Sequence, residues 1–203
     1  MHIEFLVEEL SMKEALQNLL PKILGDTNTF DIHPYQGKHN LLSKLPQRLK
    51  GYKSWLPDDY RIVVLVDEDR EDCKDLKNKL EKIALDVGFS TKNSVDIGQK
   101  FQVLNRIAIE ELEAWFFGDI DALTNAYPKV SSYIENHAKY RDPDAITGGT
   151  WEALEKVLQR SGYHQGGLEK TRAAREISLH MNPSNNRSKS FQIFYDGLLK
   201  IIA

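Results

Sequence analysis

Acidic residues gather at three places in this sequence, and each place directly follows an apolar stretch. The first is FLVEE near the start, the second is VVLVDEDRED, and the third is IAIEELEAW. Carboxylate oxygens are hard ligands of the kind that Mg²⁺ and Mn²⁺ prefer. The candidate metal ligands are Glu8, Glu9, Asp67, Asp69, Asp72, Glu110 and Glu113.

The apolar stretches before these acids have the character of β-strands. RIVVLV, at 61–66, is a continuous β-branched run, as expected of a strand buried on both faces. Residues 2–7 and 101–109 are predicted to be further strands. If the strands run parallel, all three acidic groups lie at one edge of the sheet, where open α/β sheets place their ligands. Carboxylates gathered there repel one another unless a cation neutralises them, which favours a metal site over solvated turns or helix caps.

Helical patterns separate the strands. Ser11 and Glu14 form a capping-box pattern before a helix that Gly25 ends. A strand is predicted at 29–33, and helices are predicted over 40–49, over 76–87 and from Glu110 to Phe117. The last helix would place Glu110 and Glu113 on one face. This alternation predicts an α/β fold with a mostly parallel sheet flanked by helices, in residues 1–120 of a single domain. Helices at 150–160, 170–180 and 190–202 predict a helical carboxy-terminal extension, 121–203, packed on that core.

Basic residues near these groups could bind phosphate. Lys38 follows Gly37 in a predicted loop, Arg106 precedes the third acidic group, and Arg187 lies in NRSKS. Each has a structural alternative. Lys38 could be a solvated lysine, Arg106 could pair with one of the acids, and NRSKS could cap the last helix. Lys170 and Arg172 are expected at the surface.

Composition excludes several classes of protein. The chain has 203 residues, 41% of them hydrophobic, and a net charge of −3. That apolar fraction supports a packed core, whereas the charge argues against holding nucleic acid by bulk positive charge alone. No apolar run is long enough to cross a membrane, and the amino terminus lacks the pattern of a signal peptide. The single cysteine, Cys73, cannot form an internal disulfide and has no inferable catalytic histidine. We therefore expect a cytoplasmic protein with no membrane association.

A strand ending in Glu followed by a later strand ending in Asp-x-Asp resembles the Toprim domain of topoisomerases, primases, RecR-like repair proteins and OLD-type nucleases. More specifically, nearly the whole chain resembles the bacterial domain-of-unknown-function 4276 family. The stretches that carry this likeness are LVEE, Gln36-Gly37-Lys38, LKGY, VVLVDEDREDC, RIAIEELEAWFFGD and NRSKSFQIFYDGL. The resemblance implies a Toprim-like (Rossmann-like) sheet and an ATPase partner in phage defence or mobile elements.

Carried over to this chain, the Toprim glutamate falls on Glu8, and the Asp-x-Asp pair falls on Asp67 and Asp69. The extra acids of OLD-type nucleases correspond to Glu110 and Glu113. Glu9 stands where Toprim domains have a small residue, so the geometry of that loop is expected to differ.

The resulting hypothesis is metal-assisted hydrolysis of nucleic-acid phosphodiesters with Mg²⁺ or Mn²⁺. The catalytic residues would be Glu8, Asp67, Asp69 and Lys38. Glu8 would be a general base or a ligand, and Lys38 would bind a phosphate oxygen. A haloacid-dehalogenase-type phosphatase also uses Asp-x-Asp, but Glu71 stands where that motif needs Thr or Val. The other alternative is a non-catalytic metal-binding or protein-interaction module of an ATPase complex.

Overall fold

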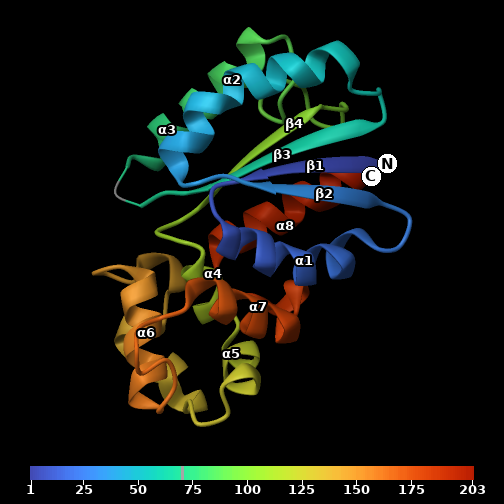
Figure 1. The fold of residues 1–203 in the computed structure, drawn as a ribbon. Helices are drawn as coiled ribbons and strands as arrows, with labels where there is room; N and C mark the ends of the chain where they lie inside the picture. The colour runs from blue at the N-terminus through green and yellow to red at the C-terminus, as the bar shows by residue number, and fades with distance from the viewer. Residues whose placement is uncertain (70) are drawn as a thin grey trace.

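The computed structural model describes residues 1–69 and 71–203, so Arg70 of the acidic run lies outside the described residues. Within them, four strands form a parallel sheet in the order β2-β1-β3-β4 (Figure 1). The strands are β1 (His2–Val7), β2 (Thr29–Pro34), β3 (Tyr60–Asp67) and β4 (Val103–Ala108). The predicted α/β fold with a parallel sheet is therefore confirmed.

The position of β3 explains its composition. It lies between β1 and β4, and every residue from Arg61 to Asp67 is buried. Its side chains alternate between two cores. Val63 and Leu65 pack on the side of α1 (Leu10–Leu24) and α8 (Lys189–Ile202), whereas Ile62, Val64 and Val66 pack towards α2 (Lys38–Trp55) and α3 (Cys73–Asp86). A strand with apolar partners on both faces must itself be apolar throughout.

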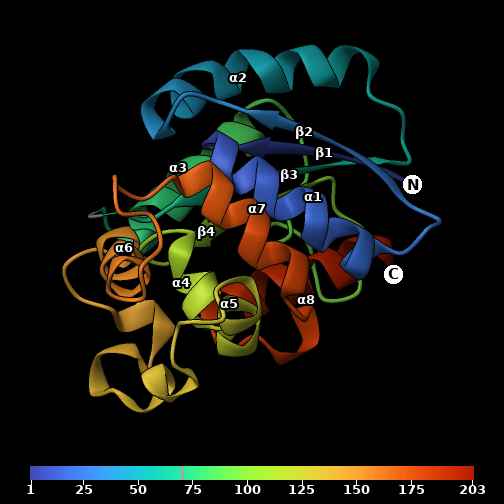
Figure 2. The same cartoon turned by 60° about the horizontal axis from the view of Figure 1, so that its bottom comes forward.

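The described elements beyond Gly118 are all helical. They are α5 (Ile120–Ala126), α6 (Thr150–Arg160), α7 (Lys170–His180), α8 and the short 3₁₀ turns η1 (Ser132–Asn136), η2 (Ala138–Tyr140), η3 (Pro143–Ala145) and η4 (Pro183–Asn185). Helix α7 lies along α1 (Figure 2), where Lys22 donates hydrogen bonds to the carbonyl groups of Leu179 and Met181 at 2.8 and 2.9 Å. These contacts attach the carboxy-terminal part to the first helix.

Three local predictions were wrong. Ser11 does not cap α1, because the helix begins at Leu10 after Glu9, and Ser11 instead donates its hydroxyl to Glu9. Helix α2 begins at Lys38 and contains Pro46 in its interior, although Lys38 was predicted in a loop. The helix predicted from Glu110 is the five-residue α4 (Glu113–Phe117), because Glu110 has a φ of +61°, outside the right-handed helical region. Glu110 and Glu113 therefore do not share a helical face.

Within residues 1–69 and 71–203, none of the helices combines the length and the apolar character needed to cross a membrane.

Candidate functional site

Glu8 and Asp67 meet at the carboxyl ends of the two central strands. Glu8 follows β1 and Asp67 ends β3, and the side chain of Glu8 accepts a hydrogen bond from the backbone N–H of Asp67 at 3.0 Å. Both residues are buried, with 8% and 5% of their surfaces exposed. The predicted convergence of the first two acidic groups is therefore present in the structure.

The loop after β4 is hydrogen-bonded to the loop after β3. The N–H of Asp69 donates to the carbonyl of Glu110 at 2.8 Å, and the N–H of Glu110 donates to a carboxylate oxygen of Glu68 at 3.1 Å. Asp69 and Glu110 both have left-handed backbones, with φ of +54° and +61°. Non-glycine residues adopt this conformation at some cost, so the surrounding contacts must hold the two loops in place.

Glu113 brings the third acidic group into the interior. It is the first residue of α4 and has 2% of its surface exposed. Burial raises the pKa of its carboxyl group to about 7, and the charges of Glu111 and Glu9 contribute in the same direction. Burial also raises the pKa of Asp67, and Glu113 is the neighbouring charge that contributes most to this rise. The carboxylate of Glu113 therefore lies close enough to Asp67 to oppose its ionisation.

Two oxygen atoms in this group have no hydrogen-bond partner among the described residues. They are Oδ1 of Asp67 and Oε2 of Glu113. A buried carboxylate oxygen without a donor is costly, because the protein does not replace the water that it has lost. Such atoms are expected where a cation or an ordered water completes the site.

Lys38 already supplies one positive charge. Its ammonium group lies 2.7 Å from Asp69 and 3.2 Å from Glu71, and it donates to the carbonyl oxygen of Glu68 at 2.9 Å. Burial lowers the pKa of Lys38, but the hydrogen bonds and charges of these acids outweigh burial and raise it overall. Lys38 was predicted at this site as a phosphate ligand, and the structure places it beside the acids.

Lys170 is the residue that sequence reasoning missed. It was expected at the surface with Arg172, and only Arg172 is exposed. Lys170 is the first residue of α7 and lies over the Trp151 ring, 5.1 Å from its centre. Burial opposes its charge, but Glu113, Glu9, Glu111 and Asp67 together raise its pKa. No local signal marks Lys170, because it reaches the site through packing between distant segments.

Other predicted residues have different surroundings. Asp72 is exposed and caps α3 by accepting the N–H groups of Lys74 and Asp75 at 2.8 and 3.0 Å. The guanidinium of Arg106 lies against α8 and donates to the carbonyl oxygen of Ile193 at 3.0 Å. Arg187 donates to the carbonyl oxygen of Phe117 at 3.4 Å. Of the three, none is hydrogen-bonded to the acids around Asp67 in the part of the chain that the structure describes.

The family model "Domain of unknown function (DUF4276)" matches residues 7–199, nearly the whole chain. The chain belongs to this family. Neither a curated protein nor a solved structure matches it. Membership in DUF4276 confirms the family resemblance, whereas the relation to Toprim domains and OLD-type nucleases stays a prediction.

The acids of this DUF4276 chain fit a metal ion in part. The orphaned oxygens of Asp67 and Glu113 suit a cation. However, no three of the described acids at this edge are close enough together to share one ion directly. Among residues 1–69 and 71–203, only His2, Glu4 and Asp31 place three potential metal-ligand atoms within 4.8 Å of one another. A metal at the acidic edge would therefore need side-chain rotation, or water molecules between the protein and the ion, which Mg²⁺ commonly keeps.

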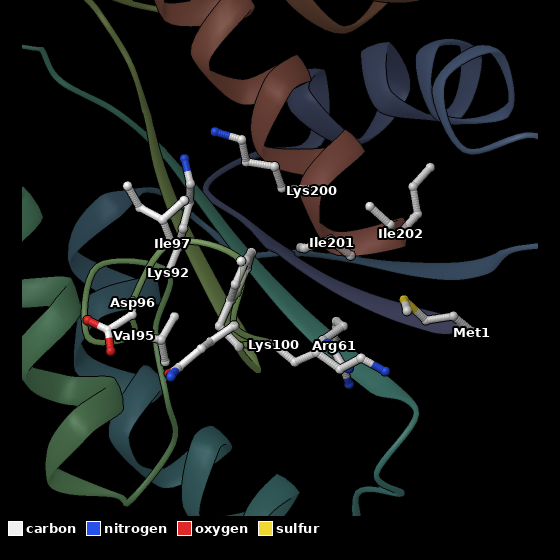
Figure 3. Close-up of a pocket in the computed structure, with 14 residues that line it drawn as sticks. Met1, Arg61, Lys92, Val95, Asp96, Ile97, Lys100, Lys200, Ile201 and Ile202 are labelled. Atoms are coloured by element: carbon white, nitrogen blue, oxygen red, sulfur yellow. The ribbon is translucent and has the colours of Figure 1, made fainter.

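A cavity of the DUF4276 chain that is partly open to solvent lies at the opposite end of the sheet (Figure 3). It has a volume of about 560 Å³, and Met1, Arg61 and Phe101 at the amino ends of the strands help to line it. Lys92, Lys100 and Lys200 lie around it, but none of the predicted site residues does. We therefore take the carboxyl edge, where the acids meet, as the candidate functional site.

Proposed function

We propose that this protein is a metal-dependent nuclease that hydrolyses nucleic-acid phosphodiesters. The observation that carries the proposal is the gathering of Glu8, Asp67, Asp69 and Glu113 at the carboxyl edge. Two buried carboxylate oxygens there have no hydrogen-bond partner among the residues that the structure describes. So much negative charge in a buried place favours a divalent cation as the missing component.

Each side chain has a task that its surroundings suit. Asp67 and Asp69 would hold the ion, and Glu113 would supply a further carboxylate oxygen. Glu8 would accept the proton of the attacking water, since burial raises its pKa towards the range that suits a general base. Lys38, held beside Asp69, would bind a phosphate oxygen when the substrate enters.

A bound Mg²⁺ or Mn²⁺ would lower the pKa of an attacking water and offset the charge of the transition state. The protein must hold both aspartates in their ionised form for this. Lys170 assists, because its positive charge favours the ionised forms of Glu113 and Asp67.

The proposal includes a cytoplasmic setting and an ATPase subunit as partner in phage defence or a mobile element. Both come from the sequence analysis and the family resemblance. Because such a nuclease could require its ATPase partner for activity, cleavage is measured with and without one.

A second candidate is a non-catalytic module that binds a metal or a protein partner. One observation favours it. Lys38 and Lys170 already compensate part of the acidic charge. In addition, no three acids of this edge, among the described residues, bring their oxygen atoms close enough together to bind one metal ion directly. In that case the acids and lysines would form an internal ion-pair network without chemistry.

The direct test is nucleic-acid cleavage with purified protein. Circular DNA, linear DNA and RNA, including tRNA, are incubated with Mg²⁺ or Mn²⁺, with and without a purified candidate ATPase partner. We expect cleavage by the wild type and a loss of at least about 100-fold in Asp67→Asn, since this change removes a ligand and a charge. A small phosphomonoester is included to detect phosphatase activity.

Asp86→Asn is the matched control, because Asp86 is exposed and pairs only with Lys82, at 2.8 Å, in the described chain. Its activity should equal that of the wild type. Cleavage that persists in Asp67→Asn would contradict the assignment of the site. If the wild type cleaves nothing under any of these conditions, the non-catalytic module is the better description.

A further inference from the structure

A second group of potential metal ligands lies on β1 and the edge strand β2. His2 and Glu4 are alternate residues of β1 and therefore project from the same face of the sheet. The strand register pairs Glu4 with Asp31 of β2. About 13 Å of extended chain separates Glu4 from Glu8, so this group is distinct from the acidic edge.

The spacing of the ligand atoms suits a tetrahedral ion. Nε2 of His2 lies 3.4 Å from Oε1 of Glu4 and 3.6 Å from Oδ2 of Asp31. Bonds of about 2.0–2.1 Å that meet at the tetrahedral angle place two ligand atoms roughly 3.3 Å apart. The observed separations therefore match ligands around one ion, and they are longer than a normal N–H···O hydrogen bond.

The ring of His2 is oriented for this role. Its Nδ1 lies 2.8 Å from the hydroxyl oxygen of Thr29. When Nδ1 carries the proton and donates it to Thr29, the lone pair of Nε2 faces the two carboxylates and can accept a proton or bind a metal ion. Metal-binding histidines are commonly fixed in this way by a partner on their other nitrogen.

Glu4 is the ligand that most needs a partner. It has 6% of its surface exposed, and its Oε2 accepts hydrogen bonds from His33 at 2.6 Å and from Tyr52 at 2.9 Å. Its Oε1 accepts none from residues 1–69 or 71–203, and it faces His2. One oxygen of this buried carboxylate is therefore held in place while the other is left for a ligand.

The site is also accessible from solvent. The side chain of Asp31 is 69% exposed. An open groove of about 930 Å³ borders Glu4 and His33, so an ion can enter without unfolding of the sheet.

We propose that His2, Glu4 and Asp31 bind Zn²⁺ or a similar divalent transition-metal ion, with water as the fourth ligand. One imidazole nitrogen and two carboxylate oxygens are a ligand set that Zn²⁺ accepts in tetrahedral geometry. The ion links β1 to the edge strand β2 and stabilises that side of the sheet. This site does not depend on the nuclease proposal.

The test measures metal binding and thermal unfolding of the untagged, full-length protein after removal of metals by a chelator. At least one Zn²⁺ per chain is expected to bind at this site and to raise the melting temperature. Co²⁺ is expected to give the visible absorption of a tetrahedral site. His2→Ala and Asp31→Asn should weaken Zn²⁺ binding by at least about 100-fold, and Thr29→Val by about tenfold.

The controls separate this site from the acidic edge. Asp67→Asn removes a ligand candidate at the edge, and His180→Ala and Asp26→Asn change exposed residues of the same types elsewhere. All three should bind Zn²⁺ as the wild type does. Asp31 is exposed, so Asp31→Asn should fold even if His2→Ala does not. No binding by the wild type, unchanged binding in Asp31→Asn, or loss of binding in Asp67→Asn would overturn the proposal.

Discussion

Glu113 has almost no access to water and has an oxygen without a hydrogen-bond donor among the described residues. Burial raises its pKa from 4.5 to about 7, so the folded protein holds this proton more tightly than the unfolded chain. In the metal-free protein, the contribution of Glu113 to stability is therefore lost as the pH rises from 4.5 to about 7, because the unfolded chain releases its proton first.

Glu113→Gln should remove this loss. At pH 4 the variant and the wild type should have nearly equal free energies of unfolding, because Glu113 is then largely protonated in both the folded and the unfolded state. At pH 8 the metal-free variant should be more stable by about 3 kcal/mol. Urea denaturation at the two pH values measures this, and equal stabilities at pH 8 would show that Glu113 is ionised without cost.

A substitution of Lys38 can distinguish a metal-binding acidic edge from a closed ion-pair network. It compensates Asp69 and Glu71, and it has 9% of its surface exposed. Lys38→Met should destabilise the metal-free protein by about 2 kcal/mol, because it leaves these carboxylates without their cation. If the edge binds metal, Mg²⁺ should restore part of this stability. Thermal unfolding with and without Mg²⁺ checks both effects, and an absence of rescue would favour a closed ion-pair network.

The sequence predicted the positions of site residues only where those residues lie at the end of a strand. Glu8 and Asp67 directly follow or end apolar strands, so the parallel fold brings them together. Lys170 reaches the same place through the packing of α7, which no local pattern records. Arg106 was linked to the acids by its nearness in sequence, but its guanidinium donates to the carbonyl oxygen of Ile193 in α8, a contact between distant segments that no local pattern records.

The start of α8 depends on an acid from a distant turn. The carboxylate of Asp144, in η3, accepts hydrogen bonds from the N–H groups of Lys189 and Ser190 at 2.5 and 3.1 Å. It also accepts the hydroxyl groups of Ser188 and Ser190 at 2.8 and 2.9 Å. This turn therefore holds the helix that packs on β4.

Asp144→Ala should destabilise the protein by about 2 kcal/mol, because it leaves several donors at a helix start unpaired. Asp196→Ala, an exposed acid on the same helix, should change the free energy of unfolding by less than about 0.5 kcal/mol. Urea denaturation compares the two, and similar values for both would contradict the role given to Asp144.

At the level of elements, buried strands and long amphipathic helices were predictable, whereas short irregular segments were not. The β-branched run of β3 marks its burial, and the apolar spacing of α6 and α7 gives their bounds. The sequence predicts a helix at Glu110, but the structure has a left-handed backbone there. Hydrogen bonds to Asp69 and Glu68, which are distant in sequence, hold that backbone. Tertiary hydrogen bonds decided the conformation there.

For the whole molecule, metal binding at the acidic edge would appear as added stability. A ligand that binds only the folded state stabilises it by about 2.7 kcal/mol when its concentration is 100 times its dissociation constant. Mn²⁺ should therefore raise the melting temperature of the wild type. The increase should be smaller in Asp67→Asn and preserved in Asp86→Asn. An equal increase in Asp67→Asn would place Mn²⁺ elsewhere.

Met1 and Ala203 both line the cavity at the amino ends of the strands, and Figure 1 shows the two termini close together. A surface anchor or a fused reporter attached at either end would leave the acidic edge free for substrates. A polyhistidine tag at the amino terminus would, in contrast, supply competing imidazoles next to His2, so purification by that route would mask the chain's own affinity for transition metals.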